Sequence, residues 1–391
     1  MDQRKIAVFS GQVPSTTFIE RLIKGLADDG FKIYLFGSNS KKVSYSKNIF
    51  LVTYSNTFQK FIILKKYTIL LLLFKRKEKK AIDKIIAQKE SNSNFLKVKY
   101  YPVLYHKPDI FHLQWGKGIA DWIWVQDFGI KIILSLRGTH ITISPSADQV
   151  LAFQYQTYFP QIDGFHAVSN AIKIEAEKFG APASKIKIIY SGLNVKKIPF
   201  SLNKIQNNPI KIVSIGRSHW VKGYTYALEA FSLLKDKNFE FQYSIVGVEN
   251  EEELIFQRAQ LGLEKHVSFE KSMPFQNIIT AIQKADVLLL SSVEEGIANV
   301  VLEAMALGTI VLSTNCGGMD EVIVNGENGF LVPIRNPQAI ADKIIKISSL
   351  SVSDKFLICK RARTAVENQH GFDTMIFQMK DLYNSVLENN E

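Results

Sequence analysis

Cysteine is almost absent from this chain of 391 residues. Only Cys316 and Cys359 occur, far apart, and neither is accompanied by histidines or acids at metal-ligand spacing. This excludes a disulfide framework and a zinc site of the usual pattern, and it indicates a reducing compartment such as the cytoplasm. An Asp-x-Asp pair is also missing, so we expect neither a bound metal nor an organic cofactor.

Long apolar runs are missing as well. No stretch reaches the roughly 18 apolar residues of a membrane span, and residues 1–15 lack the pattern of a signal peptide. There is no Walker sequence, and Gly116-Lys117-Gly118 lacks the third glycine of a dinucleotide-binding loop. We therefore expect a soluble or peripheral protein that is neither a P-loop enzyme nor a dinucleotide-binding enzyme.

What is present is an alternation of short apolar strands with helical patterns, in two series separated by a polar, proline-containing linker at 193–210. Such alternation predicts βαβ units around parallel sheets. A chain of 391 residues is longer than one hydrophobic core usually supports, so two domains are expected. We predict an α/β fold with two Rossmann-like domains, residues 1–200 and 201–371, facing each other across a cleft where ligands bind beyond the strand ends. The predicted strands are 5–10, 31–37, 109–114, 131–138, 164–169, 185–192, 211–216, 241–247, 266–270, 285–292 and 309–314.

The most informative stretch is 294–308, EEGIANVVLEAMALG. It follows a short apolar run that predicts a buried parallel strand, and its helical pattern begins near Ala298 and should end at Gly308. Glu295 is then in a strand-to-helix loop, while Asn299 and Glu303 share one helix face. The first turn of such a helix binds phosphate oxygens, and an acid one turn later can accept from a ribose diol. Taken alone, the two glutamates favour the simpler interpretation of a pair of solvated helix acids.

This stretch resembles the Glu-x7-Glu signature of the family 4 retaining glycosyltransferases, with the context EG-x-x-NV-x-LEAMA-x-G matched throughout. The resemblance implies the GT-B architecture of two Rossmann-like domains, with the helix from about 372 to 391 packing back on the first. It also implies a nucleoside-diphosphate sugar as donor, linked to uridine or guanosine diphosphate, and retention of configuration. The donor-binding residues that it implies in this stretch are Glu295, Gly296, Ile297, Ala298, Asn299, Val300 and Glu303.

A second motif, Gly216-Arg217 followed by Lys222-Gly223, resembles the G-R-x4-K-G phosphate clamp of the same family. Two fixed cations suit a diphosphate leaving group, because negative charge develops on it as the glycosidic bond breaks. Arg217 and Lys222 would replace a magnesium ion, so we predict metal-independent catalysis. The catalytic residues predicted are Arg217, Lys222 and Glu295, with Gly216 as a further donor contact.

The first half resembles the family less closely. SGQVPSTTFIE (10–20) is similar to the glycine loop and PSETFI element of exopolysaccharide transferases, which implies Gly11 at the donor and Ser15 and Thr16 at acceptor or sugar. Ser15 is equally compatible with a plain helix cap. Arg137 and His140 stand where the family has HG-x-D, so the family's catalytic roles do not transfer, and we predict them as further acceptor or sugar contacts. Gly317, Gly318 and Glu321 match the family too, and we assign them to turns and packing.

Charge is concentrated in one segment. Between 60 and 84 there are nine basic residues against two acidic ones, interleaved with apolar side chains. A solvated lysine face is one reading; docking of 58–86 on an anionic membrane is the other. The second favours a peripheral enzyme of the inner membrane face that acts on a glycan or lipid-linked glycan. A nucleotide-sugar epimerase, or a basic surface-binding module without catalysis, remains an alternative, and no nucleic-acid partner is expected.

Overall fold

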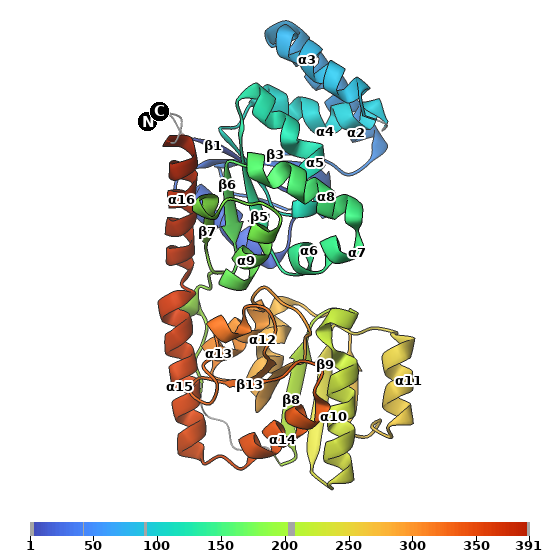
Figure 1. Ribbon diagram of the computed structural model, residues 1–391, viewed down its shortest axis with the longest axis vertical. Helices are drawn as coiled ribbons and strands as arrows, with labels where there is room; N and C mark the ends of the chain where they lie inside the picture. Colours follow the sequence, from blue (N-terminus) through green and yellow to red (C-terminus); the bar gives the residue numbers. More distant parts are fainter. Residues whose placement is uncertain (1–3, 42, 90–91, 202–207, 389–391) are drawn as a thin grey trace. The chain divides into compact units, whose positions relative to one another are not determined.

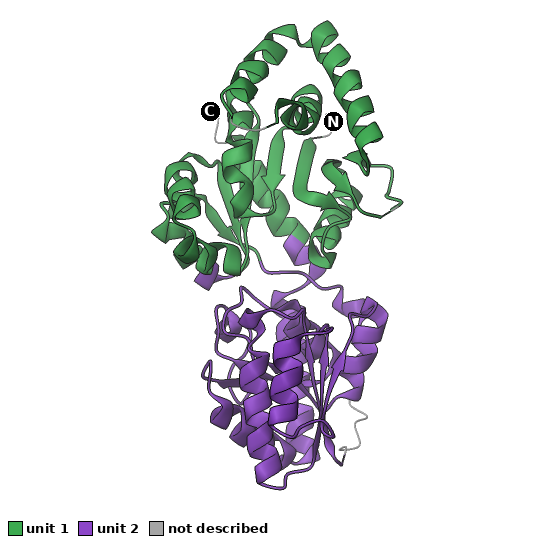
Figure 2. Ribbon diagram, turned by 90° about the vertical axis from the view of Figure 1, so that its right-hand side faces the viewer, with its two compact units in different colours: residues 1–168, 173–189, 376–391 green, residues 169–172, 190–375 purple. Residues whose placement is uncertain are grey.

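The computed structural model describes residues 4–41, 43–89, 92–201 and 208–388. Part of the linker predicted at 193–210 therefore lies outside the described residues. The chain divides into two compact units: residues 1–168, 173–189 and 376–391 form unit 1, and residues 169–172 and 190–375 form unit 2 (Figure 2). Each unit contains one parallel sheet covered by helices, so the predicted class, two Rossmann-like α/β domains, is confirmed. The predicted cleft stays a prediction.

Unit 1 is built on a seven-stranded sheet of order β3-β2-β1-β4-β5-β6-β7, in which every neighbouring pair is parallel (Figure 1). Its strands are β1 (Lys5–Val13), β2 (Lys32–Asn39), β3 (Ile49–Tyr54), β4 (Ile110–Leu113), β5 (Lys131–Leu136), β6 (Gly164–Ala167) and β7 (Ile186–Ile188). Its helices are α1 (Thr17–Asp28), α2 (Thr57–Phe74), α3 (Arg76–Ala87), α4 (Ser93–His106), α5 (Ile119–Trp122), α6 (Thr139–Thr142), α7 (Ser144–Ala147), α8 (Gln149–Tyr158) and most of α9 (Asn170–Lys178).

Unit 2 has a six-stranded parallel sheet of order β10-β9-β8-β11-β12-β13. Its strands are β8 (Ile210–Ile215), β9 (Phe241–Val246), β10 (Val267–Glu270), β11 (Val287–Leu290), β12 (Ile310–Thr314) and β13 (Phe330–Val332). Its helices are α10 (Tyr224–Asp236), α11 (Glu252–Gln260), α12 (Phe275–Lys284), α13 (Asn299–Leu307), α14 (Pro337–Ser348) and α15 (Val352–Gln369).

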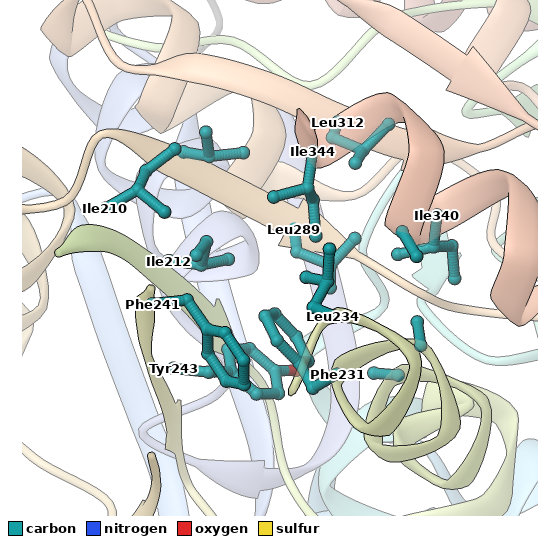
Figure 3. Close-up of a cluster of buried hydrophobic side chains, with 14 of the residues drawn as sticks. Ile210, Ile212, Phe231, Leu234, Phe241, Tyr243, Leu289, Leu312, Ile340 and Ile344 are labelled. Atoms are coloured by element: carbon teal, nitrogen blue, oxygen red, sulfur yellow. The ribbon is translucent and has the colours of Figure 1, made fainter. Parts of the chain in front are cut away.

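Apolar side chains alternate between the two faces of the unit 2 sheet, as the period of a strand requires. Ile212 and Leu289 point into one core, which α10 and α14 cover through Phe231 and Ile344 (Figure 3). The adjacent Val213 belongs to a second core on the other face, where α12 and α13 pack. Because both faces are buried at the centre of the sheet, β11 (VLLL) is apolar throughout, which is why the sequence marks it clearly.

The strand order reverses once in each sheet, between β1 and β4 in unit 1 and between β8 and β11 in unit 2. Open parallel sheets bind ligands outside the carboxyl ends of the strands at this switch point. In unit 2 the loops that leave this point carry Gly216 and Glu295. In unit 1 they carry Gly11, near the end of β1, and Gln114, just after β4. The topology therefore places most predicted site residues at two equivalent edges.

The last helix, α16 (Phe372–Glu388), contributes to unit 1 from Ile376 onward. The hydroxyl of Tyr383 lies 2.7 Å from Nδ1 of His112 in β4, and the side chains of Val386 and Leu382 lie against Gly164 in β6. These contacts are fully buried. Unit 1 is thus completed by a segment that follows all of unit 2 in the sequence.

Candidate functional site

Two loops at the switch point of unit 2 are tied to each other by their backbones. The N–H of Val293 donates to the carbonyl of Val221 (2.7 Å), and the hydroxyl of Ser291 donates to the carbonyl of Lys222 (2.8 Å). These contacts fix the loop after β11 beside the short helical turn that follows β8. The side chains that the sequence predicted at positions 222 and 295 are brought together in this way.

Lys222 and Glu295 form an ion pair in which Nζ lies 2.5 Å from Oε1. The hydroxyl of Ser292 donates to the same carboxylate oxygen (2.8 Å). Both charged side chains are mostly buried, with 22% and 16% of their surface exposed. The negative charge of Glu295 also reaches Tyr224, whose phenol pKa is raised mainly by burial and further by this carboxylate.

Glycines allow the close approach of these loops. Gly223 has φ +61°, and a Cβ there would lie 2.2 Å from the carbonyl oxygen of Ser291. Gly317 has φ +53°, and a Cβ there would lie 1.6 Å from the carbonyl oxygen of Glu295. The N–H of Gly318 donates to the carbonyl of Gly296 (3.0 Å). Gly317 and Gly318 therefore shape the predicted donor loop, a role that goes beyond the turns and packing assigned to them from the sequence.

Helix α13 begins where the sequence predicted and ends at Gly308, which has φ +81°. Its N-cap residue is Ala298, whose side chain cannot cap the free N–H groups of the first turn. Asn299 Oδ1 is buried and has no hydrogen-bond partner. Glu303 is only 7% exposed, so the interpretation of this glutamate as a solvated helix acid is wrong. Ile297 and Ala298 are buried, and Val300 is half-buried.

Arg217 follows β8 and is exposed. The residue before it, Gly216, lies against the other clamp cation, because a Cβ at Gly216 would be 3.1 Å from Cε of Lys222. The carbonyl of Gly216 accepts a hydrogen bond from the hydroxyl of Tyr224 (3.0 Å). Behind the loop, burial raises the thiol pKa of Cys316 to about 12, so this cysteine is a neutral packing residue.

The predicted residues of unit 1 are distributed over three segments. Gly11 has φ +84°, and its carbonyl accepts from Ser38 Oγ (3.1 Å). The N-cap of α1 is Thr16, whose side chain makes no capping hydrogen bond, so the alternative that made Ser15 a plain helix cap is wrong. Instead the backbone N–H of Ser15 donates to Glu20 Oε1 (2.7 Å).

Arg137 and His140 lie near the N-terminus of α1. The guanidinium carbon of Arg137 is 4.6 Å from the centre of the Phe18 ring, and His140 stacks on Trp115 with ring centres 5.1 Å apart. Arg137 Nη2 donates to Oε1 of Gln114 (2.9 Å), a buried residue that the sequence analysis missed. Its only signal in the sequence is a polar residue placed directly after an apolar strand. Burial lowers the pKa of Arg137 to about 9.

The described residues contain neither a candidate metal site nor a candidate membrane span. In the described ranges no three histidines, cysteines or acids are grouped closely enough to hold a metal ion. No helix among these residues has the length and apolar character needed to cross a membrane.

The two parallel sheets, with the Lys222–Glu295 pair and the uncapped helix at the switch point of the second, match the GT-B fold class that the sequence predicted. The known structure of Anabaena HepE in complex with UDP supports this fold, with a TM-score of 0.71 and 17% identity over 98% of this chain and all of that one. Residues 15–197 match the family described as Glycosyltransferase Family 4, and residues 196–364 match Glycosyl transferases group 1. The two matches together span residues 15–364, and both families are glycosyltransferases, as the motifs predicted.

Two relatives of this chain are named for the biosynthesis of colanic acid and of amylovoran. The putative colanic acid biosynthesis glycosyltransferase WcaL of Escherichia coli is 30% identical over 57% of this chain and 56% of its own length. The amylovoran biosynthesis glycosyltransferase AmsK of Erwinia amylovora is 29% identical over 60% of this chain and 62% of its own length. The similarity thus spans little more than half the length of these relatives.

Proposed function

We propose that this protein transfers a sugar from a nucleoside-diphosphate sugar to a hydroxyl of a glycan or lipid-linked glycan in surface polysaccharide synthesis. The observation that carries the proposal is the pairing of Lys222 with Glu295 beside the uncapped N-terminus of α13. Cationic and N–H donors meet there at the edge where parallel sheets bind nucleotides. The UDP bound by HepE and the names of WcaL and AmsK support the substrate class.

In this proposal the donor diphosphate lies over the first turn of α13. Arg217 and Lys222 bind its oxygens, and Lys222 is shared between the diphosphate and Glu295. Buried Glu303 accepts hydrogen bonds from the ribose diol, and Glu295 faces the sugar. As the bond from the anomeric carbon to phosphate oxygen breaks, the two cations stabilise the charge that develops on the leaving group.

The transfer retains the configuration of the sugar and needs no metal ion or other cofactor. The acceptor hydroxyl oxygen bonds to the anomeric carbon on the face that the phosphate leaves, and its proton passes to the departing phosphate oxygen. Arg217 and Lys222 supply the positive charge that a magnesium ion provides in other transferases. Among nucleotides, uridine and guanosine diphosphates are the proposed carriers.

A turnover screen with uridine and guanosine diphosphate sugars tests this proposal. We expect a glycosylated product that keeps the anomeric configuration of the donor, formed at the same rate with and without EDTA. Loss of activity in EDTA that magnesium restores would refute metal independence. Interconversion of the donor sugar without an acceptor would instead identify a nucleotide-sugar epimerase.

We further propose that α2 docks the enzyme on the inner face of the membrane. The helix buries only Tyr67 and Leu71. The opposite face is a stripe of exposed apolar side chains at helical spacing, and most of these residues are about half to two-thirds exposed. A stripe of this kind on a soluble domain marks an interaction surface. Its members are Phe58, Phe61, Ile62, Ile69, Leu72 and Leu73.

Positive charge borders the apolar stripe. Lys65 and Lys66 are exposed on α2, and Arg76, Lys77 and Lys80 are exposed on α3. An anionic bilayer attracts each such cation by about 1 kcal/mol, and buried leucine and phenylalanine side chains add to the attraction. Two further lysines of this segment have structural partners. Lys75 Nζ donates to the carbonyl of Leu104, and Lys79 pairs with Asp83.

Co-sedimentation with anionic liposomes at low salt tests the docking surface. Replacing Phe58, Phe61 and Leu73 with Ser, or the five exposed cations with Gln, should reduce binding and leave the melting temperature unchanged. Replacing exposed Phe256 of unit 2 with Ser is the matched control and should leave binding intact. If the wild-type protein does not co-sediment with these liposomes, the docking proposal is wrong and a soluble acceptor is favoured.

A further inference from the structure

A chain of buried polar side chains crosses the unit 1 sheet, and its protons can be placed. His166 Nε2 lies 2.9 Å from the carbonyl oxygen of Ile189, so this nitrogen is protonated and donates. Neutral His166 then accepts at Nδ1 from Ser135 Oγ (2.8 Å). Ser135 Oγ in turn accepts from His112 Nε2 (2.7 Å), whose Nδ1 accepts from Tyr383. Both histidines of this hydrogen-bonded network, His112 and His166, are neutral near pH 7, since burial lowers the pKa of each ring.

Arg137 joins this neutral chain as a cation. Its Nη2 donates to Ser135 Oγ (3.3 Å) and to Gln114 Oε1 (2.9 Å), and both acceptors are uncharged. Within the described part of the chain, no carboxylate forms an ion pair with the guanidinium. A buried charge normally has a partner of opposite sign, because removing it from water is costly. The positive charge of Arg137 is therefore uncompensated by protein groups.

Two hydrogen-bond donors at the same place are also unused. Arg137 Nε and Gln114 Nε2 are buried without a hydrogen-bond partner, and Gln114 is fully buried. Leaving one such donor unpaired costs about 1–3 kcal/mol, and more when it is charged. Native proteins keep few groups of this kind, so two of them beside an uncompensated cation indicate a site for an acceptor from outside the chain.

We propose that Arg137 and Gln114 bind an anionic group, a carboxylate or a phosphate, carried by the sugar substrate. This inference rests on the proposed transferase function and narrows its substrate class to an acidic sugar. The two residues follow β5 and β4 and lie at the carboxyl edge of the sheet, next to the switch point of unit 1. The stacked rings of Trp115 and His140 are half-buried and offer a flat face to the sugar ring.

A purely structural role is the rival explanation, in which Arg137 only holds the oxygens of Gln114 and Ser135. The two explanations differ for Gln114→Glu, which places a carboxylate beside the guanidinium. If the cation recognises an anionic ligand, this variant should fold at least as stably as the wild type and lose the ligand, because the charge is now satisfied internally. A structural role predicts no change in ligand affinity.

Titration of the purified full chain, without donor, tests the subsite. We would follow glucuronic acid, glucose 6-phosphate and glucose by calorimetry or saturation-transfer NMR. The wild type should bind at least one acidic sugar roughly tenfold or more tighter than glucose, in line with a charge-assisted hydrogen bond. The glucuronate arm identifies a carboxylate ligand and the sugar phosphate arm a phosphate ligand.

Arg137→Gln and Gln114→Glu should both abolish this preference, and Lys117→Gln, which removes an exposed cation of the neighbouring loop, should preserve it. Equal affinity of the wild type for all three sugars, or a preference that survives in Gln114→Glu, would overturn the subsite. UDP binding, measured separately by thermal shift, should be unchanged in both variants. Absence of both UDP and GDP binding in the wild type would instead overturn the transferase proposal.

Discussion

The two units have the same architecture but treat charge at their switch points differently. In unit 2, Lys222 is paired with Glu295 at 2.5 Å. In unit 1, the hydrogen bonds of the Arg137 guanidinium within the described residues go to the neutral oxygens of Gln114 and Ser135. The equivalent edges of two similar sheets therefore carry a compensated cation in one case and an uncompensated cation in the other.

This difference indicates which kind of ligand the cation at each sheet edge can bind. A cation that shares a carboxylate can bind a diphosphate and return to its partner when the product leaves, so its charge is never without an acceptor. A buried cation among neutral groups gains most from a ligand that brings its own negative charge. The common topology places both sites, and the local side chains decide their chemistry.

Breaking the unit 2 pair should have the largest effect. Lys222→Ala removes a fixed charge that faces the leaving group and should lower turnover by roughly two orders of magnitude or more, with Arg217→Ala acting in the same direction. Steady-state kinetics with a nucleoside-diphosphate sugar measures this. Lys237→Ala, at an exposed lysine paired with Asp342 in the same unit, is the control. A Lys222→Ala enzyme within a few fold of wild-type turnover would contradict the clamp assignment.

Displacing the loop that carries Glu295 should have the second largest effect on turnover. Gly317→Ala would place a Cβ 1.6 Å from the carbonyl oxygen of Glu295, so the loop must move. A displacement of about 1 Å can lower turnover roughly a hundredfold. Gly326→Ala has a comparable positive φ, +86°, with nothing within 4 Å, and it separates backbone strain from displacement. If both variants lose the same amount of turnover, the close approach is irrelevant to catalysis.

The ribose assignment predicts a smaller effect that is confined to donor binding. Glu303→Ala removes a charged acceptor that contributes about 1.5–3 kcal/mol, so donor affinity should fall roughly tenfold or more. Glu303→Gln keeps the shape of the side chain and shows whether any loss arises from the charge. Calorimetry with UDP and GDP measures the affinity, and the exposed Glu327→Ala is the control. Unchanged affinity in Glu303→Ala would refute the contact with ribose.

Lowering the pH should destabilise unit 1 more than unit 2, because unit 1 contains more buried histidines with lowered pKa values. Burial lowers the pKa of His106 to about 4 and of His166 to about 3, and it lowers that of His112 as well. The folded unit 1 then binds fewer protons than the unfolded chain below pH 6.5, so its free energy of unfolding decreases as the pH falls toward 3. Each histidine contributes a slope of roughly 1.4 kcal/mol per pH unit.

Unit 2 contains one such residue, His370, so unit 1 should unfold first on acidification. Tryptophan fluorescence can follow this, because Trp122 and Trp124 are buried in unit 1 whereas Trp220 is exposed in unit 2. A Trp220→Phe variant isolates the unit 1 signal. If the free energy of unfolding of unit 1 does not change between pH 7 and pH 4, the assignment of its buried histidines as neutral is wrong.

The sequence was sufficient to predict elements whose signal is local. The all-apolar β11, the helical pattern of α13 and its end at Gly308 follow from period, burial and backbone conformation within about 20 residues. Helices α14 and α15 were not assigned from the sequence, although α14 has a side-chain cap from Asn336 and a proline in its first turn. Attention to these start signals would have found α14.

The contacts of the candidate site could not be predicted in the same way. Lys222 and Glu295 are 73 positions apart, and their pairing depends on the parallel neighbours β8 and β11. The approach of Gly317 to Glu295 likewise exists only in the folded chain, where the missing Cβ provides the space. Gln114 carries no motif, and its importance comes from its burial beside Arg137.

Helix α16 has a consequence for synthesis of the chain. Unit 1 buries Met379, Leu382 and Tyr383, which the ribosome adds only after all of unit 2. During translation, part of the apolar surface of the unit 1 sheet and the ring of His112 therefore stay uncovered until α16 is made. By that time residues 190–375 already contain every strand of the unit 2 sheet. Unit 2 can fold as it leaves the ribosome, and the core of unit 1 is completed last, when α16 packs on it. A stalled or truncated chain would thus expose the apolar surface of an incomplete unit 1 beside a folded unit 2, and such a surface is what chaperones bind.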